Sequence, residues 1–267
     1  MPSLEERLSH ILPKLNRADK HLGDLDKAIK EFHATDPYAS IIERDPKTGE
    51  CFQRMTKVEP IPTDVRLIAG DAIQNLMSAL DHLAYQLAVV SGGGKAANPE
   101  WVYFPVGKDA PDYQAKREGK IKGCRQDILD ELDLIQPHKG GHGEGIFTLQ
   151  QLNNIEKHRL IFAVGATLSH WDVVPPKGGA VLLKSVDTGE SFEIKFGTLR
   201  AAELMVLKNG DEISRFPCKS KINEYTKARV GVAICEPDVL PIQEMVPLIF
   251  KLGKEVEKVI NRLTRFL

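Results

Sequence analysis

The stretch PTDVRLIAGDAIQNLMSALDHLAYQLAVV, residues 62–90, decides the fold expected for this chain. Its apolar side chains recur every three or four residues and cover most of a helix circumference, which predicts a helix in the middle of a bundle. One line of polar residues crosses this helix, at successive steps of four, three, four and three: Asp71, Asn75, Ser78, His82 and Tyr85. Because an unpaired buried polar group costs about 1 to 3 kcal/mol, this line is the first candidate for a functional site.

A second helical stretch, residues 146–164, carries a matching polar face. Its polar residues again recur at three- and four-residue steps, which places Gln151, Asn154 and His158 on one side with Arg159 alongside. If the two helices are antiparallel neighbours, their polar lines meet and form one site. The catalytic candidates are then His82, His158 and Arg159. The binding candidates are Asp71, Asn75, Ser78, Asp81 and Asn154.

Three further helical regions complete the expected bundle. Residues 3–32 predict a long amphipathic helix, capped by Ser3 with Glu6 three residues later and bent at Pro13. Residues 109–119 and 124–135 predict two shorter helices. Residues 241–267 predict a C-terminal helix whose last turn is basic. We interpret its Lys and Arg side chains as a solvated face, and the alternative is an RNA-binding strip.

Extended segments lie in two places. Residues 38–58 predict a β-hairpin around the turn Pro46-Lys47-Thr48-Gly49, and a short extended run follows at 101–106. From Trp171 to Cys235 the pattern predicts four or five antiparallel strands, with Asn209-Gly210 as the strongest hairpin signal, because both central residues of such a turn have positive φ. The turn signals at 175–179 and 187–189 separate the first of these strands.

The fold class predicted is α+β: a helical bundle with an N-terminal β-hairpin and an antiparallel sheet inserted before the C-terminal helix. We expect a single domain over residues 1–267. The bundle comprises residues 1–37, 62–90, 109–167 and 241–267, the hairpin residues 38–58 and the sheet region residues 170–236.

Composition excludes several classes of protein. The net charge is -1, so no global field favours nucleic acid. The N-terminus lacks an apolar signal sequence and no apolar run is long enough to span a membrane, which predicts a cytoplasmic protein without a membrane partner. The 4 cysteines are widely spaced, so reduced thiols are expected. No phosphate-binding loop, dinucleotide fingerprint or nucleophile elbow occurs, and no cofactor is expected.

Two motifs carry a resemblance to a known family. The run from Gly70 to Ala84, GDAIQNLMSALDHLA, and the run from Leu152 to Arg159, LNNIEKHR, resemble those of a group of uncharacterised bacterial and phage-borne proteins. In that group an Arg commonly stands at the position of Met77, and its spacing to the His is similar to the signature of HEPN helical-bundle nucleases. The resemblance implies RNA cleavage by acid-base chemistry in paired protomers.

This chain departs from the family pattern because Met77 replaces the Arg, which removes the cation that would stabilise the transition state. We therefore expect a HEPN-like protein that binds RNA or a protein partner, possesses degenerate nuclease activity or none, and forms a homodimer. His82 is the residue carried over from the motif, and Arg159 is a candidate substitute for the missing cation.

Three alternatives remain open. His82 and His158 could be structural, joined through Asn75, Asp81 and Asn154 as buried polar groups require. A metal-dependent hydrolase could use His82, His158, Asp81 and Glu156, or His138 and His142, although neither of the two helices has a two-ligand spacing. The third alternative is a non-catalytic structural or interaction module.

Overall fold

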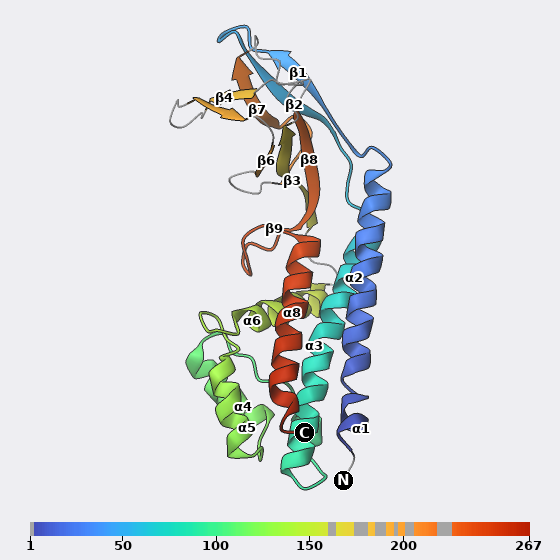
Figure 1. The fold of residues 1–267 in the computed structure, drawn as a ribbon, viewed down its shortest axis with the longest axis vertical. Helices are drawn as coiled ribbons and strands as arrows, with labels where there is room; N and C mark the ends of the chain where they lie inside the picture. The colour runs from blue at the N-terminus through green and yellow to red at the C-terminus, as the bar shows by residue number, and fades with distance from the viewer. Residues whose placement is uncertain are drawn as a thin grey trace.

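The computed structural model describes residues 3–159, 164–173, 181–184, 191–194, 197–200, 206–217 and 226–267. The side chains of His158 and Arg159 lie outside this description, as do the turn residues 175–179 and 187–189. The molecule is elongated, with a helical bundle at one end and β-strands at the other (Figure 1). The predicted α+β class is confirmed.

The N-terminal helical region is two helices rather than one bent helix. α1 spans Leu4–Leu8 and α2 spans Leu12–His33. Pro13 stands in the first turn of α2, where its missing N–H would have no helical partner in any case, so the chain restarts there instead of bending. The predicted capping box is present: Ser3 Oγ accepts from the Glu6 N–H at 3.2 Å, and Glu6 Oε2 accepts from the Ser3 N–H at 2.7 Å.

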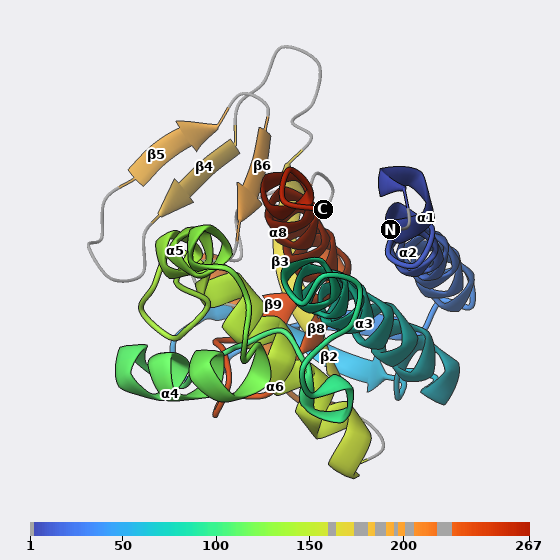
Figure 2. The same ribbon diagram turned by 90° about the horizontal axis from the view of Figure 1, so that it is seen from below.

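The central helix α3, Thr63–Ser91, is the axis of the bundle. α2, α6 (Glu144–Arg159) and α8 (Met245–Thr264) each pack against it. Seen along its axis, α2 and α6 lie on different sides of α3, and α8 lies between them on a third side (Figure 2). α2 runs antiparallel to α3 because the short β-hairpin joins their neighbouring ends (Figure 1).

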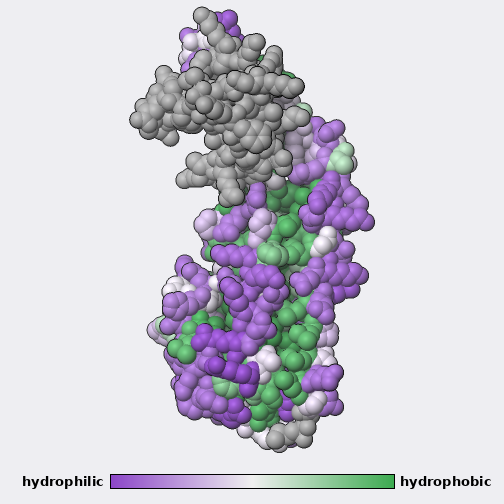
Figure 3. Space-filling model, in the orientation of Figure 1, coloured by the Kyte–Doolittle hydropathy of each residue, from purple (hydrophilic) through white to green (hydrophobic). Residues whose placement is uncertain are grey.

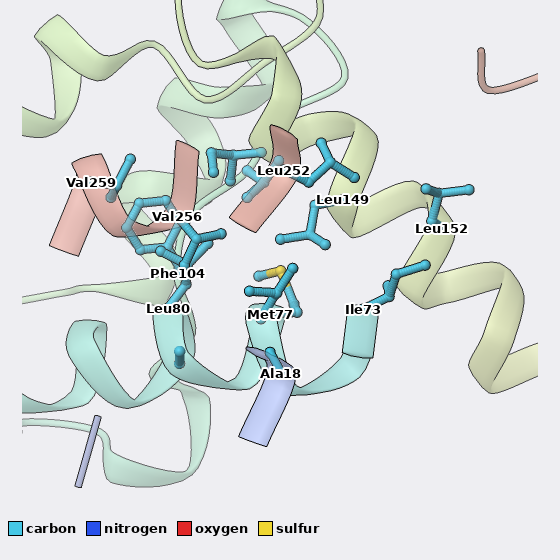
Figure 4. Close-up of a cluster of buried hydrophobic side chains, with 14 of the residues drawn as sticks. Ala18, Ile73, Met77, Leu80, Phe104, Leu149, Leu152, Leu252, Val256 and Val259 are labelled. Atoms are coloured by element: carbon cyan, nitrogen blue, oxygen red, sulfur yellow. The ribbon is translucent and has the colours of Figure 1, made fainter. Parts of the chain in front are cut away.

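The main core is built on the apolar side of α3. Its largest contributors from this helix are completely buried, and they meet buried side chains from α2, α5, α6 and α8. Figure 4 shows a section of this core, in which Ile73 and Met77 of α3 lie next to Leu149 and Leu152 of α6. At roughly 1.5 to 3 kcal/mol for each fully buried aliphatic side chain, this packing supplies most of the stabilisation of the bundle.

Two short helices and a connecting segment cover one side of the bundle. α4 spans Ala110–Lys120 and α5 spans Gln126–Ile135, as the sequence predicts. The run at 101–106 forms no strand; after the 3-10 turn η1, Pro99–Trp101, it buries Val102, Phe104 and Val106 over the helices.

The basic end of α8 is not a purely solvated face. Arg262 and Arg265 both form ion pairs with Glu131 of α5, whose side chain is buried. A buried carboxylate must be paired, so these two arginines hold α5 on the end of α8.

The β-hairpin is confirmed and becomes part of a larger sheet. β1 spans Tyr38–Arg44 and β2 spans Glu50–Val58, and the turn between them uses a positive φ of 74° at Gly49. β7, Glu212–Pro217, pairs antiparallel with β2, so that the sheet order is β1-β2-β7. β7 was not predicted from the sequence.

The second sheet has the order β6-β3-β8-β9. Its strands are β3 (Val164–Val173), β6 (Gly197–Arg200), β8 (Thr226–Ile234) and β9 (Gln243–Glu244). β4 (Val181–Lys184) and β5 (Ser191–Ile194) form a separate antiparallel pair. A small core of Met55, Ala166, Leu168 and Leu207 joins the two larger sheets.

Two boundaries in this region were predicted wrongly. The helix expected over 146–164 ends at Arg159, and β3 already begins at Val164, because Val164 to Leu168 pair along β8. Short apolar runs fit either a helix or a strand, and here the long-range pairing decides. The bundle segment 109–167 is therefore too long at its end, and the sheet region begins before residue 170.

The Asn209-Gly210 turn is present but does not close a hairpin. Only Gly210 has a positive φ, of 92°, whereas Asn209 does not. The residues on either side have different partners: Val206 bridges to Thr167 of β3, while β7 pairs with β2. The turn thus passes the chain from one sheet to the other.

Cys51 is disulfide-bonded, which contradicts the expectation of four reduced thiols. Cys124 and Cys235 are free. Disulfide bonds persist mainly in oxidising compartments, so the redox state of Cys51 bears directly on where the protein works.

Candidate functional site

The polar line of α3 lies on the side of the helix that faces solvent. Asp71 and Tyr85 are exposed, and Asn75, Ser78 and His82 between them are half-buried. The Asn75 side-chain amide donates to the Asp71 carbonyl oxygen at 2.8 Å, within the same helix. The side chain of Asn75 therefore finds its hydrogen-bond partner within α3, whereas the ring of His82 has neighbours on another helix.

Those neighbours belong to the N-terminal helices. The pKa of His82 is lowered, chiefly by burial and then by the charges of Lys14 and His10. Both groups act on the imidazole in the same direction, because a nearby positive charge disfavours a second one. The polar line of α3 thus meets α2 and the turn before it.

α6 approaches the opposite end of the line. Glu156 packs against Gly70, and the pKa of Glu156 is raised by burial and by the negative charge of Asp71. His82 lies twelve residues beyond Gly70, about 18 Å along the helix axis. The structure therefore brings Asp71 to α6 but separates His82 from the last turn of that helix, which carries His158 and Arg159.

Polar side chains follow one flank of α2 at steps of four, three and four, and these are His10, Lys14, Arg17 and His21. Arg17 Nε donates to Nε2 of His21 at 3.0 Å, and His21 is buried. Since α2 and α3 are antiparallel and Lys14 lies near His82, the step of seven from Lys14 to His21 matches the step of seven from His82 back to Asn75. We call this surface, made of His10, Lys14, Arg17, His21, Asn75, Ser78 and His82, the basic seam.

The cations of the basic seam are not neutralised by carboxylates. Among the residues whose side chains the structure describes, neither Lys14 nor Arg17 forms an ion pair with Asp or Glu. Elsewhere on the same helix, Lys27 pairs with Glu31 and Lys30 pairs with Asp26 at 2.6 Å. Unpaired cations beside two imidazoles form a local patch that attracts anions although the whole chain is nearly neutral.

Met77 does not belong to the basic seam. Its side chain is buried among Ile73, Leu149 and Leu152 (Figure 4), on the side of α3 that α6 covers. Met77 lies five positions before His82, which corresponds to a rotation of about 140° around the helix. An Arg at this position would lie under α6, whereas the cations next to His82 come from α2.

Asp81 has a role in holding the fold together. One carboxylate oxygen, Oδ1, accepts the backbone N–H of Phe104 at 3.0 Å, which fastens the buried run 102–106 to α3. Burial raises the pKa of Asp81 to about 6, and the Phe104 N–H, Lys157 and Lys120 act against this rise. Asp81 faces this segment rather than the basic seam.

On α6, the side chain that packs inward is not the predicted one. Asn154 is exposed, whereas its neighbour Asn153 is 2% exposed and its Oδ1 has no hydrogen-bond partner. The sequence could have indicated the burial of Asn153, because this residue directly follows Leu152 and lies four residues after Leu149 on the apolar side of the helix.

Of the residues named for the metal alternative, His158 has a side chain outside the described residues, and the other five do not gather in one place. Within the described part of the chain, no group of three or more His, Cys, Asp or Glu side chains could hold a metal ion. The His138 ring lies against Tyr113, and its Nδ1 is 3.0 Å from the Lys139 carbonyl oxygen. His142 is exposed in the loop before α6.

Among the described helices, none is both long enough and apolar enough to cross a membrane. Searches with protein-family models, against curated proteins and against solved structures found no match to this chain.

Proposed function

We propose that this chain is a HEPN-like, RNA-binding protein whose basic seam binds the phosphodiester backbone of single-stranded RNA. The observation that carries the proposal is the row of cations along α2, Lys14 and Arg17, without carboxylate partners among the described side chains and beside His82. Phosphate contacts from Lys and Arg supply most of the affinity of sequence-independent binding.

The same surface supports only weak nuclease chemistry. With its pKa lowered, His82 is neutral near pH 7 and is able to accept a proton, for instance from a ribose 2′-hydroxyl. Lys14 is a cation close enough to act on His82, but it lies on a different helix from the motif and is a point charge rather than a bidentate guanidinium. We therefore propose binding with degenerate or absent cleavage.

RNA binding is tested by fluorescence anisotropy with a short labelled single-stranded RNA. The double variant Lys14→Glu/Arg17→Glu reverses two charges of the basic seam and is expected to weaken binding by about tenfold or more, and to reduce the salt dependence. The matched control is Lys27→Glu/Lys30→Glu, which also reverses two charges on α2, at exposed positions thirteen and sixteen residues from Lys14 and about 140 to 160° around the axis. Equal affinities for the double variant and the control would remove the basic seam from the proposal.

Cleavage is tested separately with the same RNA on a denaturing gel. If a residual activity exists, it should disappear in His82→Ala and should persist in Asn154→Ala, because Asn154 is exposed on α6 and outside the basic seam. Cleavage that is identical in wild type and His82→Ala excludes His82 from the chemistry.

A cytoplasmic location remains part of the proposal, and Cys51 provides its test. In a reducing cytosol the Cys51 disulfide should be open, whereas the bond forms in the structure. Thiol alkylation of the protein in freshly lysed cells, followed by mass analysis, distinguishes the two states. An alkylated Cys51 supports the cytoplasm, and a protected Cys51 supports an oxidising compartment.

A further inference from the structure

Apolar side chains reach the surface of the bundle in two different ways. In the first, they line a groove where α2 meets α8, which Figure 3 shows as a hydrophobic band between two hydrophilic borders. In the second, aromatic rings project from the connecting segment between α3 and α4. There, Trp101 is 67% exposed and Tyr103 is 46% exposed. Among the described residues, Trp101 is the most exposed of the large apolar side chains.

Trp101 and Tyr103 lie on the same side of their segment. Val102 and Phe104 alternate with them and are buried, and Val102 has extended backbone angles, with φ of -78° and ψ of 115°. Since the side chains of an extended chain alternate between two faces, the exposed rings are neighbours, about 7 Å apart along the segment. The buried side chains anchor the segment on the helices. The rings are therefore held in place before a ligand arrives, which lowers the entropy lost on binding.

Two cations accompany the rings. Nζ of Lys120, the last residue of α4, lies 4.5 Å from the centroid of the Tyr103 ring. Lys120 and Lys157 of α6 are both near enough to act on the carboxylate of Asp81. The other two cations of α4 form ion pairs with Asp side chains, whereas Lys120 and Lys157 form none within the described part of the chain. We call the surface made of Trp101, Tyr103, Lys120 and Lys157 the aromatic platform.

The aromatic platform adjoins the basic seam around α3. The Phe104 N–H donates to Asp81, which directly precedes His82, and this bond fixes the segment of the platform to α3. Tyr85, which is 38% exposed, lies about 40° around the helix from Asp81 and about 60° from His82, between the two. A strand that contacts His82 and the cations of α2 can therefore continue past Tyr85 to the platform.

We propose that the aromatic platform stacks bases of the RNA strand whose phosphates the basic seam binds, while Lys120 and Lys157 contact the phosphates of the stacked nucleotides. This inference rests on the proposed RNA binding and adds base contacts to it. Aromatic rings beside cations suit a single strand, because every base has a π-face and an unpaired base leaves that face open.

Base stacking is tested by anisotropy titration with a labelled single-stranded RNA and with a base-free ribose-phosphate oligomer of the same length. Trp101→Ala should weaken binding of the RNA about fivefold or more and leave the affinity for the base-free oligomer unchanged. Trp101→Phe keeps a ring and should retain most of the affinity. The matched control is Leu134→Ala, which removes another exposed apolar side chain, 59% exposed, on α5. Circular dichroism checks that each variant folds.

The outcomes separate the aromatic platform from the basic seam. If the wild-type chain does not bind the RNA, both proposals fail. If it binds the RNA and Trp101→Ala binds equally well, only the platform is wrong, and a protein partner becomes the better explanation of the exposed rings. Equal weakening for the RNA and the base-free oligomer also contradicts base stacking.

Tryptophan emission gives a direct readout of stacking. The chain has 2 tryptophans, so Trp171→Phe leaves Trp101 as the only one. Because a base stacked on an indole ring quenches its fluorescence, the emission of this variant should fall when the single-stranded RNA is added. The base-free oligomer at the same phosphate concentration should leave the emission unchanged. Emission that stays constant at saturating RNA overturns the platform.

Discussion

The two flanks of α2 differ although they share one helix and one buried stripe. On one flank, Lys14 and Arg17 meet the polar line of α3 and leave a row of cations at the surface. On the other, Ala18 and Leu22 meet α8 and leave an apolar groove. Each surface of the bundle is therefore formed by two neighbouring helices, and its polarity follows from the side chains that both helices place there.

The largest effect is expected at the stripe between the two flanks. Leu25 is fully buried there, and Leu25→Ala should lower the free energy of unfolding by roughly 2 to 5 kcal/mol through lost packing and a cavity. Leu12→Ala, at an exposed position of the same helix, should change it by about 0.5 kcal/mol or less. Urea denaturation measures both. Similar losses at the two positions would mean that α2 is not anchored by this stripe.

The next effect concerns Asp81, which faces away from both flanks of α2. Its pKa is about 6 in the folded protein against an ordinary value of 3.8, so the folded protein holds the proton more tightly and loses stability as pH rises from about 4 to 6. Asp81→Asn keeps an acceptor for the Phe104 N–H without a buried charge. It should stabilise the protein by roughly 1 to 3 kcal/mol at pH 7.

Thermal unfolding at two pH values measures this effect. The melting temperature of Asp81→Asn should exceed that of the wild type at neutral pH, and the difference should vanish below about pH 4, where both side chains are neutral. A variant that melts at a lower temperature at neutral pH would show that the negative charge of Asp81 stabilises the folded protein, contrary to this prediction.

A smaller effect is expected in the pH dependence of RNA binding at the basic seam. As pH falls from about 7.5 to 5.5, His82 gains a positive charge and the affinity for RNA should rise several-fold. Burial, Lys14 and His10 lower the pKa of His82. The rise in affinity that His82 causes should therefore occur at pH values below 6.5, the ordinary pKa of histidine. His82→Gln should flatten that part of the curve. Anisotropy at constant ionic strength gives the comparison, and coincident curves would exclude His82 from contact with RNA.

The smallest effect is expected on the groove flank. Asp19→Asn removes a charge that is exposed and lies across α2 from the basic seam, so RNA affinity at physiological salt should change by less than about twofold. The measurement is the same anisotropy titration. A change as large as that of the Lys14→Glu/Arg17→Glu variant would mean that the two flanks do not act separately.

Helical periodicity was sufficient to predict the bundle and the polar line of α3. α3, α4 and α5 lie close to their expected positions, and the line from Asp71 to Tyr85 is on the less buried side of its helix. What periodicity does not contain is the identity of the neighbouring helix. From the sequence, His82 was expected to lie beside the helix that is α6. The polar residues from His10 to His21, at steps of four, three and four, indicate a matching flank on α2 instead.

The strands were harder to predict than the helices, because their partners can be distant in the sequence. Local patterns predicted the hairpin of β1 and β2, because its two strands are close in the chain. β7 was missed and the Asn209-Gly210 turn was misread, since both depend on pairing with residues far away in the sequence. The end of α6 was misplaced for the same reason: only the presence of β8 makes Val164 to Leu168 a strand.

The pairing of β2 with β7 has a consequence for the order in which the chain assembles. Gln53 lies beside Ser214, 161 residues later, so β2 leaves the ribosome long before its neighbour exists. α2, the hairpin and α3 can form early from local contacts, but one edge of β2 stays open until nearly the whole polypeptide has been made. Such an edge invites strand exchange between nascent chains, and closing it is expected to be the slow step of maturation.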